Sequence, residues 1–162
     1  MKTFISLSAL FLSLSLTAQT NPATWYLNDT SGNGIQSPLS IASGDYSTAM
    51  GRGTTASGSK STAMGQNTIA SGDTSTAMGY LTTASGDRSS AMGMITESSG
   101  THSTAMGYRV TASDRSSLVI GEYNLLGSTV TNSATDFSLE NTAFVIGNGT
   151  GSDNRNDALV VK

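Results

Sequence analysis

Apolar and polar positions recur with a period of fourteen residues through the middle of the chain, from residue 40 to residue 121. The phrase STAMG begins at Ser47, Ser61, Ser75 and Ser103, and the related phrase SSAMG begins at Ser89. A second phrase, ASG, lies midway between these at Ala42, Ala56, Ala70 and Ala84, and reads SSG at Ser98 and ASD at Ala112. A fixed period is typical of a solenoid, in which each repeat forms one coil stacked on the next.

Each repeat predicts two short strands separated by two corners. In the first repeat, residues 47–50 and 54–57 have strand length, and glycines mark corners at 51–53 and 58–60. We expect these glycines to supply the positive φ angles that tight corners require. The expected corner glycines are Gly44, Gly51, Gly58, Gly65, Gly72, Gly79, Gly86, Gly93, Gly100, Gly107 and Gly121. The expected fold class is therefore all-β, a β-solenoid of flat coils.

The first strand of each repeat is apolar on both faces, because successive side chains of a strand point to opposite faces. One apolar column consists of Ala49, Ala63, Ala77, Ala91, Ala105 and Val119, and the other of Met50, Met64, Met78, Met92, Met106 and Ile120. One column suits the narrow inside of the coil, and the other needs cover from outside. The alternation does not say which is which. Self-association is the economical source of that cover, because oligomers of identical chains are usually closed and symmetric.

The second strand of each repeat has one small column and one polar column. The small column is that of the ASG phrase, and the column beside it consists of Thr55, Ile69, Thr83, Glu97 and Thr111. We expect this strand to face water, so that the coil has one wet wall and one dry wall.

These phrases resemble the head-domain repeats of trimeric autotransporter adhesins, the YadA-like or Hep/Hag repeats. The shared pattern is a serine, a small residue, alanine, isoleucine and glycine, followed half a period later by alanine, a variable residue and glycine. Methionine replaces the usual isoleucine in all repeats but the last, at Ile120. The resemblance covers about half of the chain. It implies a left-handed parallel β-roll, a homotrimer around a common axis, and adhesion to extracellular matrix or other surface macromolecules.

The two ends of the chain differ from the repeats. Residues 1–18 have one lysine, a short apolar run and small residues at the end, which is typical of a secretory signal peptide. Residues 19–39 are expected to form a lead-in or cap, and 40–124 the repeat array. Residues 125–162 are expected to form a diverged coil and a C-terminal junction, because their ending resembles the junction in repeat-bearing secreted or fibre-like proteins that continue into further modules. The family's stalk and membrane barrel do not follow, which favours an incomplete chain over repeats placed on a different carrier. We expect the protein to be secreted or at the cell surface, and associated with the outer membrane if the full-length chain carries an anchor.

Composition narrows the possible partners. The chain has no cysteine, so stacking rather than disulfide bonds must stabilise it. Charged residues make up 12% of the chain and aromatic residues 6%, which argues against an ordinary globular core. The formal net charge of -3 is scattered along the sequence, so we expect neither nucleic acid nor anionic lipid as a partner.

The residue types do not support catalysis or metal binding. His102 is the one histidine and shares a variable corner position with Arg88 and its equivalents, so we expect it to face solvent. Aspartates recur near one corner, at Asp45, Asp73, Asp87 and Asp114, but calcium needs about six to eight oxygen ligands, and turn chemistry explains them better. The glycines lack the lysine of a phosphate loop, and the methionine column fits packing better than a soft metal. We therefore expect no catalytic residue, cofactor, metal or small-molecule substrate.

Any ligand specificity is expected at the irregular corners, where the exposed candidates are Arg52, Tyr80, Arg88, Tyr108 and Arg109. The functional hypothesis is an adhesin-type module, and the alternative is a structural spacer that carries another domain. Ice binding is a weaker alternative. It would use the threonine column, but Thr48 shares a face with Met50, which we expect to be covered.

Overall fold

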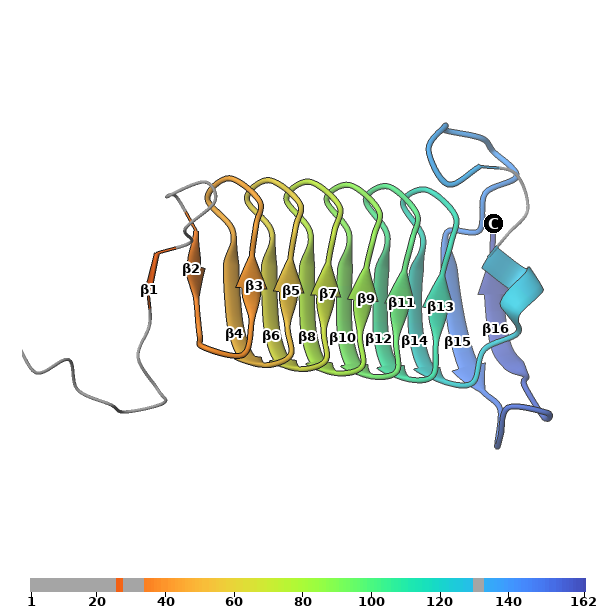
Figure 1. Ribbon diagram of the computed structural model, residues 1–162. Coiled ribbons are helices and arrows are strands. Elements are labelled where there is room, and N and C mark those ends of the chain that lie inside the picture. Colours follow the sequence, from red (N-terminus) through yellow and green to blue (C-terminus); the bar gives the residue numbers. More distant parts are fainter. Residues whose placement is uncertain (1–25, 28–33, 130–132) are drawn as a thin grey trace, which may run out of the picture.

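A computed structural model describes residues 26–27, 34–129 and 133–162, and the predicted signal peptide lies outside them. Between Ile41 and Glu122 the chain forms six coils stacked in a row (Figure 1). Each coil has a short strand followed by a long one. The short strands are β3 (Ile41–Ala42), β5 (Thr55–Ala56), β7 (Ile69–Ala70), β9 (Thr83–Ala84), β11 (Glu97–Ser98) and β13 (Thr111–Ala112). The long strands are β4 (Thr48–Arg52), β6 (Thr62–Gln66), β8 (Thr76–Tyr80), β10 (Ser90–Met94), β12 (Thr104–Tyr108) and β14 (Leu118–Glu122).

The coils form two parallel walls. The short strands make a six-stranded sheet, the short-strand wall. The long strands make the centre of a ten-stranded sheet, in which β1 (Tyr26–Leu27) and β2 (Ile35–Gln36) precede β4, and β15 (Phe144–Asn148) and β16 (Asp157–Val161) follow β14. The outermost pairs, β1 with β2 and β15 with β16, are antiparallel. The expectation of an all-β solenoid is confirmed.

Strand register follows the sequence period. Met64 pairs with Met50 on one side and with Met78 on the other, so equivalent residues of successive repeats lie side by side. The register continues beyond the last full repeat, where Gly121 pairs with Gly147 although twenty-six residues separate them. The intervening chain contains a short 3-10 helix, η1 (Leu126–Thr129). No helix in the described part of the chain is long and apolar enough to span a membrane.

The inside of the coil is narrow and is filled by small side chains. The alanine column of the long strands and the alanine column of the short strands both point inward and are fully buried. Two columns of hydroxyl residues complete the interior, one beginning at Ser47 and the other at Thr54. Methionine lies on the outer face of the long strands, where Met78 is half-buried. The structure thus decides the point that alternation left open: alanine takes the coil interior and methionine the outside.

The corners differ from the expectation in two ways. The long strands extend through Gly51 and Arg52, so the first-corner glycine lies within a strand and the corner comes one to two residues later. The left-handed corner conformation is adopted mostly by other residues. At one corner it falls on Tyr46, Lys60, Thr74, Arg88, His102 and Ser116, with φ between 56° and 61°, and at the other on Asn67, Leu81, Ile95, Arg109 and Tyr123, with φ between 46° and 57°. The first glycine of each repeat does adopt positive φ, from 101° at Gly121 to 137° at Gly107, so the prediction is confirmed for that column. At the corner positions named above, other residues supply the left-handed conformation, and there the prediction is wrong.

The second glycine of each repeat has a different reason. Gly58, Gly72 and their equivalents do not adopt positive φ and are buried in the stack. A Cβ on Gly72 would lie against the carbonyl oxygen of Gly86 in the next coil, closer than real atoms approach. Close stacking of coils, rather than corner geometry, therefore requires glycine in this column.

In the last coil, the position of this glycine column is occupied by an aspartate. Asp114 occupies the glycine column where no further coil stacks upon it, and it is buried, not exposed at the corner like Asp45, Asp73 and Asp87. Its Oδ2 accepts a hydrogen bond from the backbone N–H of Thr142, at 2.8 Å. Asp114 therefore joins the C-terminal segment to the end of the solenoid, and grouping it with the corner aspartates was wrong.

Candidate functional site

The outer face of the ten-stranded sheet carries two outward columns, and we call this surface the methionine face. Its first column is Thr48, Thr62, Thr76, Ser90, Thr104 and Leu118, and its second is Met50, Met64, Met78, Met92, Met106 and Ile120. Strand register adds Phe144 and Ile146 of β15, and then Val161 and Leu159 of β16. Both columns become fully apolar toward the C-terminal end.

Neither column contains a charged residue, and both remain accessible in the single chain. Met106 is 40% exposed and Leu118 38%, while the other methionines of the columns are half-buried by their neighbours. Contiguous apolar surface of this kind marks an interaction site on soluble proteins. The threonines that suggested ice binding lie on this same face, as strand alternation predicts.

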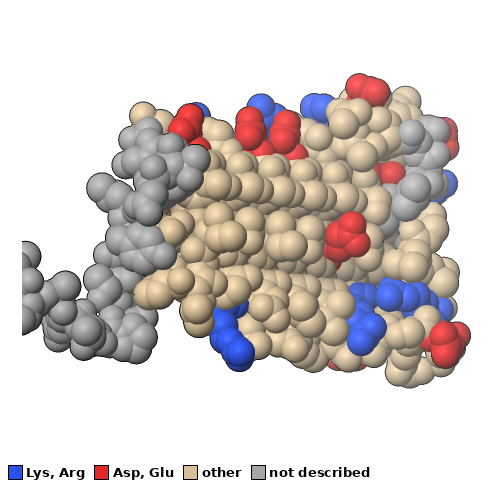
Figure 2. All heavy atoms as spheres, viewed as in Figure 1, with Lys and Arg blue, Asp and Glu red and all other residues tan. Residues whose placement is uncertain are grey.

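The short-strand wall has a different surface. Its outward column of Thr55, Ile69, Thr83, Glu97 and Thr111 is exposed or half-buried, and the alanines beside it point inward. Figure 2 shows this wall as largely uncharged, with charged side chains concentrated along the two corners. The outward column therefore combines threonine hydroxyls with the exposed Ile41 and Ile69 and the single charge of Glu97.

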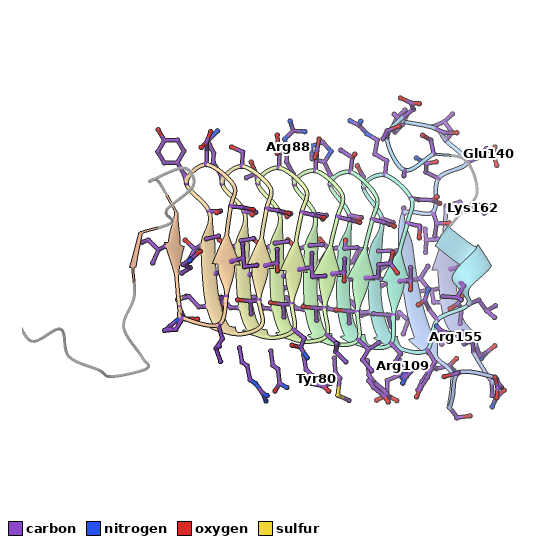
Figure 3. The ribbon with its side chains drawn as sticks, in the orientation of Figure 1. Tyr80, Arg88, Arg109, Glu140, Arg155 and Lys162 are labelled. Carbon is purple, nitrogen blue, oxygen red and sulfur yellow. The ribbon has the colours of Figure 1, made fainter. Side chains whose placement is uncertain are left out.

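The five candidate ligand-facing residues do not lie together. Arg88 is on one corner, whereas Tyr80 and Arg109 are on the other (Figure 3). Arg52 and Tyr108 share the corner of Tyr80, because the three residues end long strands of the same sheet. Arg52, Tyr80 and Arg88 are exposed, and Tyr108 and Arg109 are half-buried. The lower corner in Figure 3 therefore holds four of the five candidates.

Tyr108 and Arg109 belong to a cluster that the sequence did not reveal. The Tyr108 and Tyr123 rings meet edge to face, with centroids 5.1 Å apart. The Arg109 guanidinium lies 5.7 Å from the Tyr108 ring centroid and 5.9 Å from that of Tyr123, and Arg155 lies 5.7 Å from the Tyr123 ring. Stacking of the coils brings Tyr123 beside Tyr108. Arg155 lies in this cluster because the C-terminal segment folds back on the last coil. No pattern in the sequence predicts that contact.

Hydrogen bonding within this cluster shifts its titration. Interaction with Tyr123, and then with Arg109, lowers the pKa of the Tyr108 hydroxyl below its ordinary value. The same contact with Tyr108 raises the pKa of Tyr123. The hydrogen bond from Arg109 Nε to the Tyr108 hydroxyl, at 3.2 Å, raises the pKa of Arg109. The guanidinium therefore stays charged and is oriented by its tyrosine neighbour.

The histidine and the corner aspartates make contacts between neighbouring coils. His102 is exposed, and its Nε2 lies 3.1 Å from Arg88 Nη1 of the preceding coil. The carboxylates of Asp73 and Asp87 accept hydrogen bonds from backbone N–H groups one coil earlier, at 3.2 and 3.1 Å. The described residues contain no group of three or more metal-ligating side chains.

Parallel coils, an uncharged methionine face and irregular corners define a β-solenoid repeat module. The family model described as YadA head domain repeat (2 copies) matches residues 42–68, 70–94 and 98–121. The repeat array therefore belongs to the YadA head domain repeats, which confirms the resemblance seen in the sequence. This family is a non-enzymatic repeat of bacterial surface adhesins. A comparison with curated proteins finds no match.

Proposed function

We propose that the protein is an adhesin-type module of the cell surface, in which three chains associate through their methionine faces. The observation that carries the proposal is the long, uncharged methionine face, which the single chain leaves uncovered. Burying apolar area there stabilises association by about 25 cal/mol for each Å² removed from water. The family relationship supports three chains and left-handed winding.

This arrangement would leave the short-strand wall and the corners facing outward. Three identical walls raise avidity when each contact is weak, because the second and third contacts become intramolecular. Attachment to extracellular matrix or other surface macromolecules would then use area and multiplicity. Export is supported by residues 1–18, whose sequence has features typical of a signal peptide.

Sedimentation of a charge variant tests the assembly. Met78→Asp places an unpaired charge in the centre of the methionine face. Truncating a buried methionine alone costs about 2 to 5 kcal/mol, and a buried charge costs more, so we expect trimer to become monomer. Thr83→Asp is the matched control on the short-strand wall and should leave the trimer unchanged. A trimer that survives Met78→Asp, or a well-folded monomeric wild-type chain, would contradict the proposal.

Attachment needs its own test, since a trimer could also be only a spacer. Beads that carry the whole chain are applied to immobilised extracellular matrix proteins, and the retained beads are counted under flow. We expect retention, and we expect it to fall in the double variant Arg52→Ser, Tyr80→Ser, which alters an exposed corner. Retention equal to that of uncoated beads would contradict adhesion to these proteins and would favour the spacer function.

A further inference from the structure

A pocket lies where the last coils of the solenoid meet the C-terminal segment, and we call it the junction pocket. The corner residues Leu81, Ile95 and Arg109 line one side, together with the outer column of β9, β11 and β13. Leu126 of η1 and Arg155, in the connection between β15 and β16, line the other. Its volume of about 350 Å³ is within the range of small-molecule sites.

The junction pocket opens on the short-strand wall, on the opposite side of the coil from the methionine face. Association through the methionine face would therefore leave it accessible. The pocket also interrupts the repeat, because its C-terminal side comes from η1 and from Arg155 instead of a seventh coil. Within the described coils it does not recur with the repeat, unlike the corners.

Two arginines line the pocket, and the protein holds the side chains of both. Arg109 is oriented by Tyr108, and its Nη1 lies 3.4 Å from Ser152 Oγ. Arg155 Nη1 donates hydrogen bonds to the carbonyl oxygens of Arg109 and Asn124, at 3.1 and 3.0 Å. Neither Nη2 group has a partner in the described structure. Each arginine thus keeps N–H donors for a ligand while the protein already fixes its side chain. Binding then costs less side-chain entropy.

The charge in the pocket is not balanced. Glu97 is exposed on β11 and lines the same pocket, and its carboxylate has no ion-pair or hydrogen-bond partner among the described residues. Arg109 and Arg155 together with Glu97 leave one positive charge in excess. A ligand with one negative charge would neutralise it. A carboxylate suits two guanidiniums because its oxygens accept paired N–H donors in one plane.

The rest of the lining favours hydroxyl groups on that ligand. Glu97 is flanked by Thr83 and Thr111, which pair with it in register on the neighbouring short strands. A carboxylate between two hydroxyls accepts hydrogen bonds from a neutral polyol without adding to its charge. The three aliphatic side chains of the pocket provide contact for C–H groups.

We propose that the junction pocket binds a carboxylate-bearing sugar, such as a hexuronic or sialic acid residue of a glycan. The sugar carboxylate pairs with Arg109 and Arg155, and its hydroxyls donate to Glu97. This proposal does not depend on the trimer, because every lining residue comes from one chain.

Saturation-transfer NMR on the full chain tests the site, with glucuronic acid and N-acetylneuraminic acid as probes. We expect saturable binding of at least one acid, and no binding of its neutral methyl ester. Acetate should bind more weakly than the sugar acid, and glycine, a zwitterion, should not compete. Equal binding of acid and ester would overturn the role of the arginines. Competition by glycine, acetate as strong as the sugar, or no binding of either acid would overturn the ligand class.

Variants locate the site. Arg109→Gln and Arg155→Gln should each lower the affinity for the sugar acid by about 10- to 100-fold, because each substitution removes hydrogen bonds to the charged carboxylate. Arg52→Gln and Arg88→Gln remove the same charge elsewhere and should leave affinity unchanged. Leu126→Asp places a carboxylate in the pocket from an exposed position, so it tests the site even where an arginine variant folds poorly. Unchanged binding in Leu126→Asp would overturn the proposal, and sedimentation of the same variants follows the trimer separately.

Discussion

The side-chain amide of Asn124 pairs with the backbone of Thr111 in the way that a neighbouring strand would. Asn124 Oδ1 accepts from the Thr111 N–H at 2.9 Å, and Nδ2 donates to the Thr111 carbonyl at 3.1 Å. Thr111 is in β13, the last strand of the short-strand wall. At the first strand of that wall, Gln36 Oε1 accepts from the N–H of Ala42 at 2.8 Å. Long amide side chains thus close both edges of the sheet.

Asn124→Ala should open the C-terminal edge of the short-strand wall. Asn124 is fully buried, and its loss removes two hydrogen bonds to the backbone of Thr111. At about 1–3 kcal/mol for each bond, we expect the free energy of unfolding to fall by roughly 2–6 kcal/mol. Hydrogen exchange should show the loss first at Thr111. Asn156→Ala, which removes an exposed amide, is the control, and equal exchange rates in both variants would contradict the edge-closing role.

Gly72→Ala should destabilise the stack. The new Cβ would lie against the carbonyl groups of Ser85 and Gly86, which are backbone and cannot swing away. We expect a loss of about 1–3 kcal/mol in the free energy of unfolding, measured by denaturant titration. Gly151→Ala is the matched control, because nothing lies within 4 Å of its added Cβ. If both variants were equally stable, steric contact between coils would not be the reason for this glycine.

Thr82→Val should stabilise the protein. Thr82 is fully buried, and its Oγ1 has no hydrogen-bond partner in the described structure. Val110 occupies the same interior column two coils later and is also fully buried. Removing an unsatisfied hydroxyl should raise the free energy of unfolding by about 1–3 kcal/mol. The neighbouring Thr83→Val, on the outer face, should have little effect. A loss of stability in Thr82→Val would show that a buried water satisfies the hydroxyl.

Thr74→Asn should relieve strain at a corner. Thr74 has φ of 58°, a left-handed conformation that costs most residues about 1–2 kcal/mol but that asparagine tolerates. We expect the melting temperature to rise, with a gain of about 1 kcal/mol. Ser59→Asn makes a similar change where φ is not left-handed and should be neutral. A melting temperature unchanged in Thr74→Asn would mean that contacts of the threonine offset the strain.

Much of the fold could be predicted because the repeat is local. The phrase around Met64 recurs at Met78, and equal phrases place equal residues opposite one another in adjacent strands. The repeat also contains a signal for the C-terminal cap of the short-strand wall. Asn124 continues the interior column of Thr96 and Val110, and an asparagine there departs from the column's pattern. Corner conformation could not be predicted, since residues as different as Lys60 and His102 adopt the same left-handed angle.

Contacts at the candidate sites involve segments of the chain that the repeat does not relate. Tyr108 and Arg109 were identified as exposed corner residues, but they are half-buried beside Tyr123 and Arg155. Arg155 is forty-six residues from Arg109, and no period relates the two. Their contact depends on how the C-terminal segment folds back on the last coil, which is a tertiary event.

The period, the two strands of each coil, the register between coils and the membership of the array in the YadA head domain repeats all follow from the amino-acid sequence. Alternation also shows that Ala49 and Met50 face opposite ways. That alanine is the one inside the coil follows from the packing of the two walls. The reason is volume: the two walls of the coil approach too closely for methionine, because small residues also line the opposite wall. A choice that depends on two walls at once cannot be made from one strand.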